Sequence, residues 1–174
     1  MAEDLLITRP SIKMESDILE YRQEYLDFGE TSINGSCGLS HYECFDEWLE
    51  LTLSIENERL KNNYHASTFF SVRKSDNRII GSIQLRHYLT PDLEQHGGHI
   101  GYGIRPPERR KGYGRQQLLL VLDVARSMRI PKVMITCDKD NVPSGKTALS
   151  CSGVLAYENV FNGKEQQIYW INLC

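Results

Sequence analysis

The residue types best suited to chemistry in this chain lie in one short stretch, Gly101 to Arg115. It reads GYGIRPPERRKGYGR, and its two prolines separate a predicted strand from a predicted helix. The loop between them is rich in cations and glycines: Arg109, Arg110, Lys111, Gly112, Gly114 and Arg115. Glycine lets a backbone turn tightly and approach a ligand closely. We therefore expect this loop to lie against a bound anion.

The start of the following helix strengthens that expectation. Its first N–H groups have no partner within the helix, and the helix dipole adds partial positive charge there. Together with the cations, these groups predict a cradle for phosphate or pyrophosphate. The alternative is a solvated basic helix start with a turn glycine. The chain as a whole carries a formal net charge of -3, so its basic character is local, and a general nucleic-acid binder is excluded.

Two patterns typical of nucleotide-binding proteins fail on inspection. Gly98, Gly101 and Gly103 have the order G-x-x-G-x-G and lie within a predicted strand, whereas the dinucleotide fingerprint needs G-x-G-x-x-G at a strand-to-helix turn. Gly145-Lys146-Thr147 resembles the end of a P-loop, but the glycine required five residues earlier is Asp140. A nucleotide-binding module is therefore excluded.

Composition predicts a globular protein with one domain over residues 1–174. The chain has 174 residues, of which 40% are hydrophobic and 25% are charged. Its five cysteines have no C-x-x-C spacing, so neither a metal site nor a disulfide framework is predicted. The first residues do not resemble a signal peptide, and the most apolar stretch, Leu118–Leu122, is far shorter than a membrane span. We therefore expect a cytoplasmic protein that does not bind membranes.

Hydrophobic periodicity predicts the element order β-α-α-β-β-β-α-β-α-β-β. The strands are expected at Asp4–Arg9, Ser67–Arg73, Ile79–Tyr88, His99–Ile104, Lys132–Cys137, Val154–Phe161 and Gln166–Leu173. The helices are expected at Glu15–Phe28, Phe45–Leu60, Gly114–Met128 and Ser144–Cys151, with a long loop at Gly29–His41 and a turn at Pro91–Gly97. This order predicts a mixed α/β sheet of about seven strands with about four helices, not a parallel Rossmann alternation.

The run R-x-x-G-x-G at Arg109–Gly114 resembles the acyl-CoA motif of the GCN5-related N-acetyltransferase (GNAT) family. The resemblance continues into Asn141 and Ser144, which match the asparagine and small residue that open the family's next helix. Further segments resemble a bacterial subgroup of that family: Arg86-His87, Gly97–Tyr102, Ile104–Pro106 and Tyr169–Ile171. The family's element order fits the whole chain.

The resemblance implies a GNAT-like fold with acetyl-CoA as co-substrate and no metal. In this family the backbone amides of the motif bind the CoA pyrophosphate, and two strands splay apart to admit the pantetheine arm. Carried over, the cofactor-binding residues would be Tyr102, Gly103, Ile104, Arg109, Arg110, Lys111, Gly112, Tyr113, Gly114, Arg115, Asn141 and Ser144. For Asn141 a plain helix cap is an alternative.

The resemblance also implies direct transfer of an acetyl group from CoA to an amine, which must first lose a proton. The sequence departs from the family pattern here. The strand glutamate used by some members is replaced by Gly98, and the tyrosine acid used by many is replaced by Ala148. His99 and His87 are substitutes for the base and Tyr157 for the acid. The alternative for each is a structural side chain.

The acceptor site is expected to involve the region Gly29–Trp48, since family members use their first two helices and the loop between them for this purpose. Arg86 is either an anchor for a substrate carboxylate or a surface cation. The leading hypothesis is an N-acetyltransferase that acts on a primary amine of a small molecule or a peptide, as a monomer or homodimer. The alternative is a non-catalytic CoA-binding or regulatory module.

Overall fold

The computed structural model describes residues 4–57 and 65–174. In this part of the chain the strands are β1 (Leu5–Thr8), β2 (Ala66–Arg73), β3 (Ile79–Arg86), β4 (Ile100–Ile104), β5 (Lys132–Asp138), β6 (Val154–Phe161) and β7 (Lys164–Asn172). The α-helices are α1 (Glu15–Asp27), α2 (Phe45–Asn57), α3 (Pro91–Gln95), α4 (Tyr113–Ser127) and α5 (Val142–Ser150). The predicted α/β fold with seven strands is confirmed, and so is the predicted order of its long elements.

Two details of the helices and strands near the cleft differ from the prediction. The turn expected at Pro91–Gly97 contains the short helix α3, because Pro91 occupies its first turn and the Thr90 hydroxyl oxygen accepts a hydrogen bond from the Leu93 N–H. Residues 4–57 and 65–174 therefore contain five α-helices rather than the four predicted. Strand β4 begins at Ile100, so His99 lies outside it. A helix was also predicted over Phe45–Leu60. The structure describes it as α2 up to Asn57, and the rest of the predicted range lies outside the described residues.

The strands form two sheets rather than one central sheet. Their orders are β1-β2-β3-β4 and β5-β7-β6, and every ladder within them is antiparallel. In the described residues the two sheets meet through one bridge, between Gly98 and Ile135. This bridge is antiparallel, but it lies before β4 begins at Ile100, so the parallel neighbour implied for β4 stays a prediction. Gly97 and Gly98 have φ angles of 103° and 61°, and this left-handed backbone redirects the chain just before β4.

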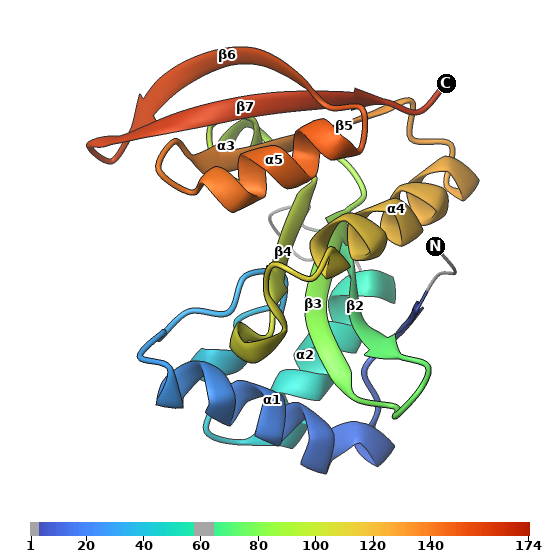
Figure 1. The fold of residues 1–174 in the computed structure, drawn as a ribbon. Coiled ribbons are helices and arrows are strands. Elements are labelled where there is room, and N and C mark those ends of the chain that lie inside the picture. The colour runs from blue at the N-terminus through green and yellow to red at the C-terminus, as the bar shows by residue number, and fades with distance from the viewer. Residues whose placement is uncertain (1–3, 58–64) are drawn as a thin grey trace.

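Helices cover both faces of the first sheet, which explains why β2 and β3 are buried along almost their whole length. α1 and α2 pack on one face and α4 on the other, and α5 lies beside the second sheet (Figure 1). Successive strand residues therefore enter different clusters: Phe70 packs with α1 and α2, whereas Phe69 packs with α4. This packing places α4 against β4, and β4 in turn lies against β5.

Candidate functional site

A cavity of about 800 Å³ lies where β4 and β5 separate. One wall is formed by Ile100–Ile104 of β4 and the other by Thr136–Asp138 at the end of β5. The lining continues in two directions. One leads to the loop Arg109–Arg115, which we call the loop end and of which every residue except Lys111 lines the cavity. The other leads to a group that we call the sheet end, formed by His96, Asp138 and Gln166. The structure thus places the predicted anion-binding loop at one end of a cleft.

The backbone of the loop end is built to receive an anion. Gly112 has a φ of 85° and Arg110 a φ of 62°, so the chain turns sharply before α4 begins at Tyr113. In the described part of the chain, no hydrogen bond uses the N–H group of any residue from 110 to 115 as its donor. Consecutive free amides at a helix N-terminus favour a phosphate group.

The side chain of Arg109 supports this loop rather than the cavity. Its guanidinium forms two hydrogen bonds with the Glu30 carboxylate, at 2.6 and 2.8 Å, and a third with the Ile104 carbonyl oxygen at 2.9 Å. It also lies over the Tyr25 ring at 5.4 Å. Hydrogen bonding from Arg109 holds the pKa of Glu30 below its usual value. Arg109 therefore fastens the loop end to the segment that follows α1.

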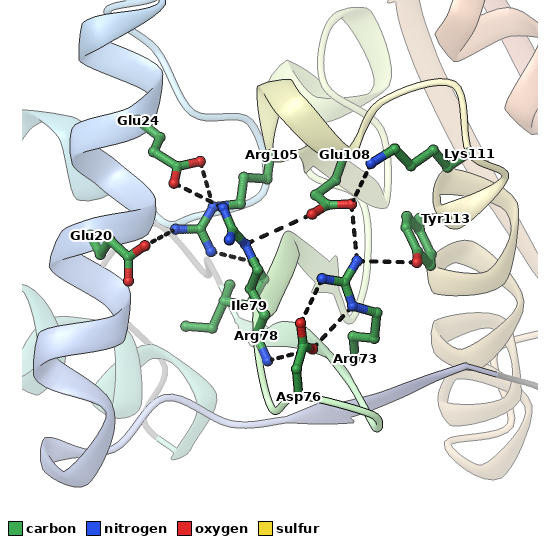
Figure 2. Close-up of polar contacts among 10 residues, drawn as sticks. All are labelled: Glu20, Glu24, Arg73, Asp76, Arg78, Ile79, Arg105, Glu108, Lys111 and Tyr113. Carbon is green, nitrogen blue, oxygen red and sulfur yellow. Dashed lines mark hydrogen bonds and ion pairs between the residues drawn. The ribbon is translucent and has the colours of Figure 1, made fainter.

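Lys111 is also occupied by a carboxylate. Figure 2 shows the network: Glu108 accepts hydrogen bonds from Lys111 and from Arg73, both at 3.0 Å, and Arg73 also contacts the Tyr113 hydroxyl at 3.3 Å. Arg105, fully buried beside this network, donates to the Glu24 carboxylate at 2.7 Å. The loop is thus attached through ion pairs to the β2–β3 hairpin and to α1.

The remaining cations keep their charge available at the loop end. Arg110 is exposed and its guanidinium has no hydrogen bond or ion pair with any described residue. Arg115 uses only its Nε, which donates to the Ser150 carbonyl oxygen at 3.2 Å. Lys146 of α5 is exposed and lines the same cavity. Of the four cations predicted in the loop, Arg109 and Lys111 are therefore paired with carboxylates of the protein. Arg110 and Arg115 are not paired with any described carboxylate, so their charges remain available to a bound anion.

The exposed edge of β4 presents alternate residues to the cleft. The Arg105 N–H bonds to Ile80 and the His99 carbonyl oxygen accepts from Arg86, so the odd-numbered residues from 99 to 105 face β3. The backbone groups of Tyr102 and Ile104 therefore face the cleft, where the prediction put them. Gly103 lines the cavity, but its backbone faces β3.

Tyr102 also brings β4 to the start of α5. Its hydroxyl lies 3.0 Å from the Ser144 carbonyl oxygen and 2.9 Å from the Ser144 Oγ, and burial raises the pKa of this phenol well above its usual value. Asn141 caps α5, because its Oδ1 accepts a hydrogen bond from the Ser144 N–H at 3.4 Å. Asn141 lines the cavity as well, so the helix cap and a CoA contact are compatible.

His99, the first candidate base, has a structural environment. The residue is 7% exposed, and its Nδ1 accepts a hydrogen bond from the Met134 N–H at 2.9 Å. A neutral ring in this arrangement carries its proton on Nε2 and offers no free lone pair. Burial, aided by the charge of Arg86, lowers the pKa of His99 to about 4. His99 is also absent from the cavity lining, so the geometry favours the structural alternative.

The other two proton-transfer candidates lie outside the lining too. His87 bonds through Nε2 to the Ser67 Oγ at 2.8 Å and through Nδ1 to His65 at 3.1 Å, and burial lowers its pKa. Tyr157 lies on β6 with 48% of its surface exposed. The structure therefore brings none of the three to the cleft.

The two departures from the family pattern have steric reasons. A Cβ on Gly98 would lie 2.5 Å from the Met134 carbonyl oxygen, so no glutamate fits there without a shift of β5. Ala148 is fully buried in the core between α5 and β7.

The sheet end contains residues that the sequence analysis missed. His96, Asp138 and Gln166 come from the end of α3, from β5 and from β7, and no spacing in the sequence links them. Arg86, which was predicted to be an anchor or a surface cation, lines the cavity and donates to the Gly97 and Gly98 carbonyl oxygens at 3.0 and 3.1 Å. From the expected acceptor region, Glu30, Ser32, Asn34 and Gly35 reach the cavity.

Two absences were also found within residues 4–57 and 65–174. No group of three or more histidine, cysteine or acidic side chains is arranged to hold a metal ion. No helix in the same ranges is long and apolar enough to span a membrane.

Comparison with known proteins identifies one family model and many similar folds. Residues 47–152 match the acetyltransferase (GNAT) domain. Similar solved structures include the microcin C7 self-immunity acetyltransferase MccE in complex with acetyl-CoA and AMP, at 18% identity and a TM-score of 0.71, covering 97% of this chain and 92% of that one. Another is the ribosomal-protein-S5-alanine acetyltransferase from Vibrio fischeri, at 15% identity and a TM-score of 0.72, covering 99% and 94%.

A third similar structure contains mutant forms of the spermidine/spermine N-acetyltransferase SpeG from Vibrio cholerae. It is 17% identical with a TM-score of 0.63, and the match covers 97% of this chain and 95% of that one. At these identities the similarity concerns the fold. A search of curated proteins gave no match.

Proposed function

Because the chain belongs to the GNAT family and is an acetyl-CoA-dependent N-acetyltransferase, we propose that it acetylates a primary amine of a small molecule or a peptide in the cleft between β4 and β5. The observation that carries this proposal is the loop end, where the amides of residues 110–115 lie free beside Arg110 and Arg115. We further propose that residues 1–174 act as one domain, which is supported by structural matches over 97–99% of the chain.

In the proposed complex the loop end binds the pyrophosphate of acetyl-CoA, and the pantetheine arm follows the free edge of β4. Tyr102 would offer its backbone groups to the arm, and Ile104 its N–H group, since the Ile104 carbonyl oxygen already accepts from Arg109. Asn141 and Ser144 would lie on the other side of the arm. The thioester would then reach the closed part of the cleft, where the bridge between Gly98 and Ile135 joins the two sheets. Arg109, Lys111 and Gly103 support this arrangement indirectly, through ion pairs or close packing.

The reaction joins the amine nitrogen to the acetyl carbon and breaks the carbon–sulfur bond. Starting from the ammonium form, the products are the acetamide, CoA thiol and one released proton. For an amine with a pKa of ~10.4, forming the neutral nucleophile at pH 7 costs about 4.6 kcal/mol. The backbone N–H groups at the β4 edge can stabilise the developing oxyanion. Since His99, His87 and Tyr157 lie outside the cleft lining, we propose that water in the open cleft removes the proton.

A panel of amines, incubated with acetyl-CoA and assayed for free thiol, tests the proposal. We expect thiol release that depends on the amine, together with an equal amount of acetylated product. A protein that binds acetyl-CoA but releases no thiol with any amine of the panel would support the non-catalytic alternative, which the comparisons do not favour.

A further inference from the structure

The sheet end of the cleft contains hydrogen-bond acceptors that the protein itself leaves unused. Gln166 of β7 is 2% exposed, yet its Oε1 has no hydrogen-bond partner in the described structure. Burying an amide oxygen without a partner is unfavourable, so such atoms are rare in folded proteins. Gln166 lines the cavity, and a ligand in the cavity can therefore supply the missing donor.

The neighbours of Gln166 fix which end of its amide is free. Its Nε2 lies 2.8 Å from the His96 Nδ1 and 3.5 Å from the Asp138 Oδ1. A carboxylate oxygen can only accept, so Nε2 must be the atom facing Asp138, and Oε1 is left over. The His96 ring is itself held by stacking on Phe161, with centroids 4.4 Å apart and planes 1° from parallel.

Three strands contribute to one polar row across the sheet. Asp138 pairs with Gln166, and Gln166 pairs with Asn159 of β6. Directly paired residues share a face, so the three side chains lie side by side. The Asn159 Oδ1 is buried and has no partner in the described residues either. Asn159 does not line the cavity, so the row offers the Asp138 carboxylate and the free Gln166 oxygen to it, and a group with N–H bonds would complement them.

The two cations nearest to this row, Lys164 and Arg86, do not take up its free oxygens. Lys164 approaches the Asp138 Oδ2 at 3.5 Å, but its side chain is largely exposed. Arg86 lines the same cavity and bonds to the Gly97 and Gly98 carbonyl oxygens. Cys137, between Thr136 and Asp138, packs into the core with α5, so the row lies on the opposite face of β5.

We propose that Asp138 and Gln166 form a subsite for a protonated nitrogen of the acceptor, separate from the amine that is acetylated. The proposal rests on the proposed function, because it assigns the acceptor's place in the same cleft. It predicts that diamines are better acceptors than monoamines. A trimethylated nitrogen keeps the charge but has no N–H, so it should not satisfy the free oxygens.

The experiment compares three probes: a linear diamine, the monoamine of the same length, and the diamine with its second nitrogen trimethylated. Each is titrated calorimetrically into CoA-saturated protein and assayed with acetyl-CoA. Since a hydrogen bond to a charged group contributes ~1.5–3 kcal/mol, we expect the diamine to bind at least tenfold more tightly than the other two. Gln166→Met and Asp138→Asn should each weaken diamine binding by about tenfold, with acetyl-CoA affinity unchanged.

Gln167→Met is the matched control, since Gln167 neighbours Gln166 but faces the other side of the sheet. It should leave diamine binding unchanged. Gln166→Met loses the Nε2 contact with His96 together with the unpartnered oxygen, so its Tm is measured alongside to show that the variant is folded at the temperature of the titration. Equal binding of the three probes, or unchanged diamine binding by both site variants, would overturn the subsite. Tight, Gln166-dependent binding without thiol release would instead support the subsite and contradict the proposed reaction.

Discussion

The two ends of the cleft are built in different ways. The loop end comes from one continuous stretch, residues 109–115, with free backbone amides and exposed cations. The sheet end comes from three segments, the end of α3, β5 and β7, and it presents a carboxylate and an amide. An anion would be held at one end and a protonated amine at the other. Local backbone geometry forms the first end, whereas strand register forms the second.

A buried arginine, Arg105, lies beneath the loop end and is held by an ion pair and a backbone hydrogen bond. Arg105 is fully buried and donates to the Glu24 carboxylate at 2.7 Å and to the Ile79 carbonyl oxygen at 2.8 Å (Figure 2). Arg105→Met should therefore lower the free energy of unfolding by about 3 kcal/mol, since it breaks a buried ion pair. Denaturant unfolding measures this. A loss below about 1 kcal/mol would show that the loop does not depend on Arg105.

The conformation of Gly112 gives the largest expected effect on acetyl-CoA binding. A Cβ there meets no atom within 4 Å, but the φ of 85° disfavours any β-branched side chain. Gly112→Val should weaken acetyl-CoA binding by about a hundredfold, because the amides of the loop would turn away from the ligand. Calorimetric titration provides the measurement.

Gly163 supplies the control for this variant. It has a φ of 78°, its Cβ would also be unobstructed, and it lies in the β6–β7 turn away from the cleft lining. Gly163→Val should lose similar stability, about 1–2 kcal/mol, yet bind acetyl-CoA normally. If both variants lost affinity equally, general strain rather than the loop geometry would be responsible.

His99 gives a stability effect that depends on pH. Its folded-state pKa of about 4 is lower than the value of ~6.5 for an unfolded chain, so the unfolded state binds more protons between these values. The stabilisation is present above pH 6.5 and is lost as the pH falls toward 4. Between pH 7.5 and 5 the loss should be about 2 kcal/mol.

His99→Gln should remove this part of the pH dependence of unfolding. Because His99 lies outside the cavity lining, the variant should keep the pH profile of turnover. If the low-pH limb of the turnover profile disappeared in His99→Gln, His99 would be the base after all.

The cations of the loop end give the smallest effects. Arg110→Ala should weaken acetyl-CoA binding by about three- to tenfold at low salt, and added salt should reduce the difference, since exposed charges are screened. Lys111→Ala should matter less, because Glu108 already neutralises Lys111. Titrations at two salt concentrations separate the two cases. A larger effect of Lys111→Ala than of Arg110→Ala would contradict this account, because it would show that Lys111 rather than Arg110 interacts with acetyl-CoA.

The same contrast explains what the sequence could predict. Periodicity located the long helices and all seven strands, since their apolar residues follow one core. The loop end was predictable because its residues are contiguous. The engagement of Arg109 by Glu30 was not, since the two lie far apart in sequence.

Proton-transfer candidates were the least predictable part of the site. His99 was proposed because it neighbours Gly98, but the left-handed backbone at Gly97 and Gly98 directs its ring to the Met134 N–H. Gln166 and Asp138 gave no sequence signal, because only the register of β5 and β7 makes them neighbours. Residues that become neighbours only through strand pairing have no fixed spacing along the chain, so the sequence pattern could not predict that they lie together.

Amide hydrogen exchange of the loop, measured by NMR with and without CoA, tests most directly the claim that the loop end binds the pyrophosphate. The N–H groups of residues 110–115 have no acceptor in the described structure, so they should exchange rapidly in the free protein. CoA should slow their exchange strongly, while amides in the distant β6–β7 turn should not change. Unchanged exchange at residues 110–115 in protein saturated with CoA would contradict the account.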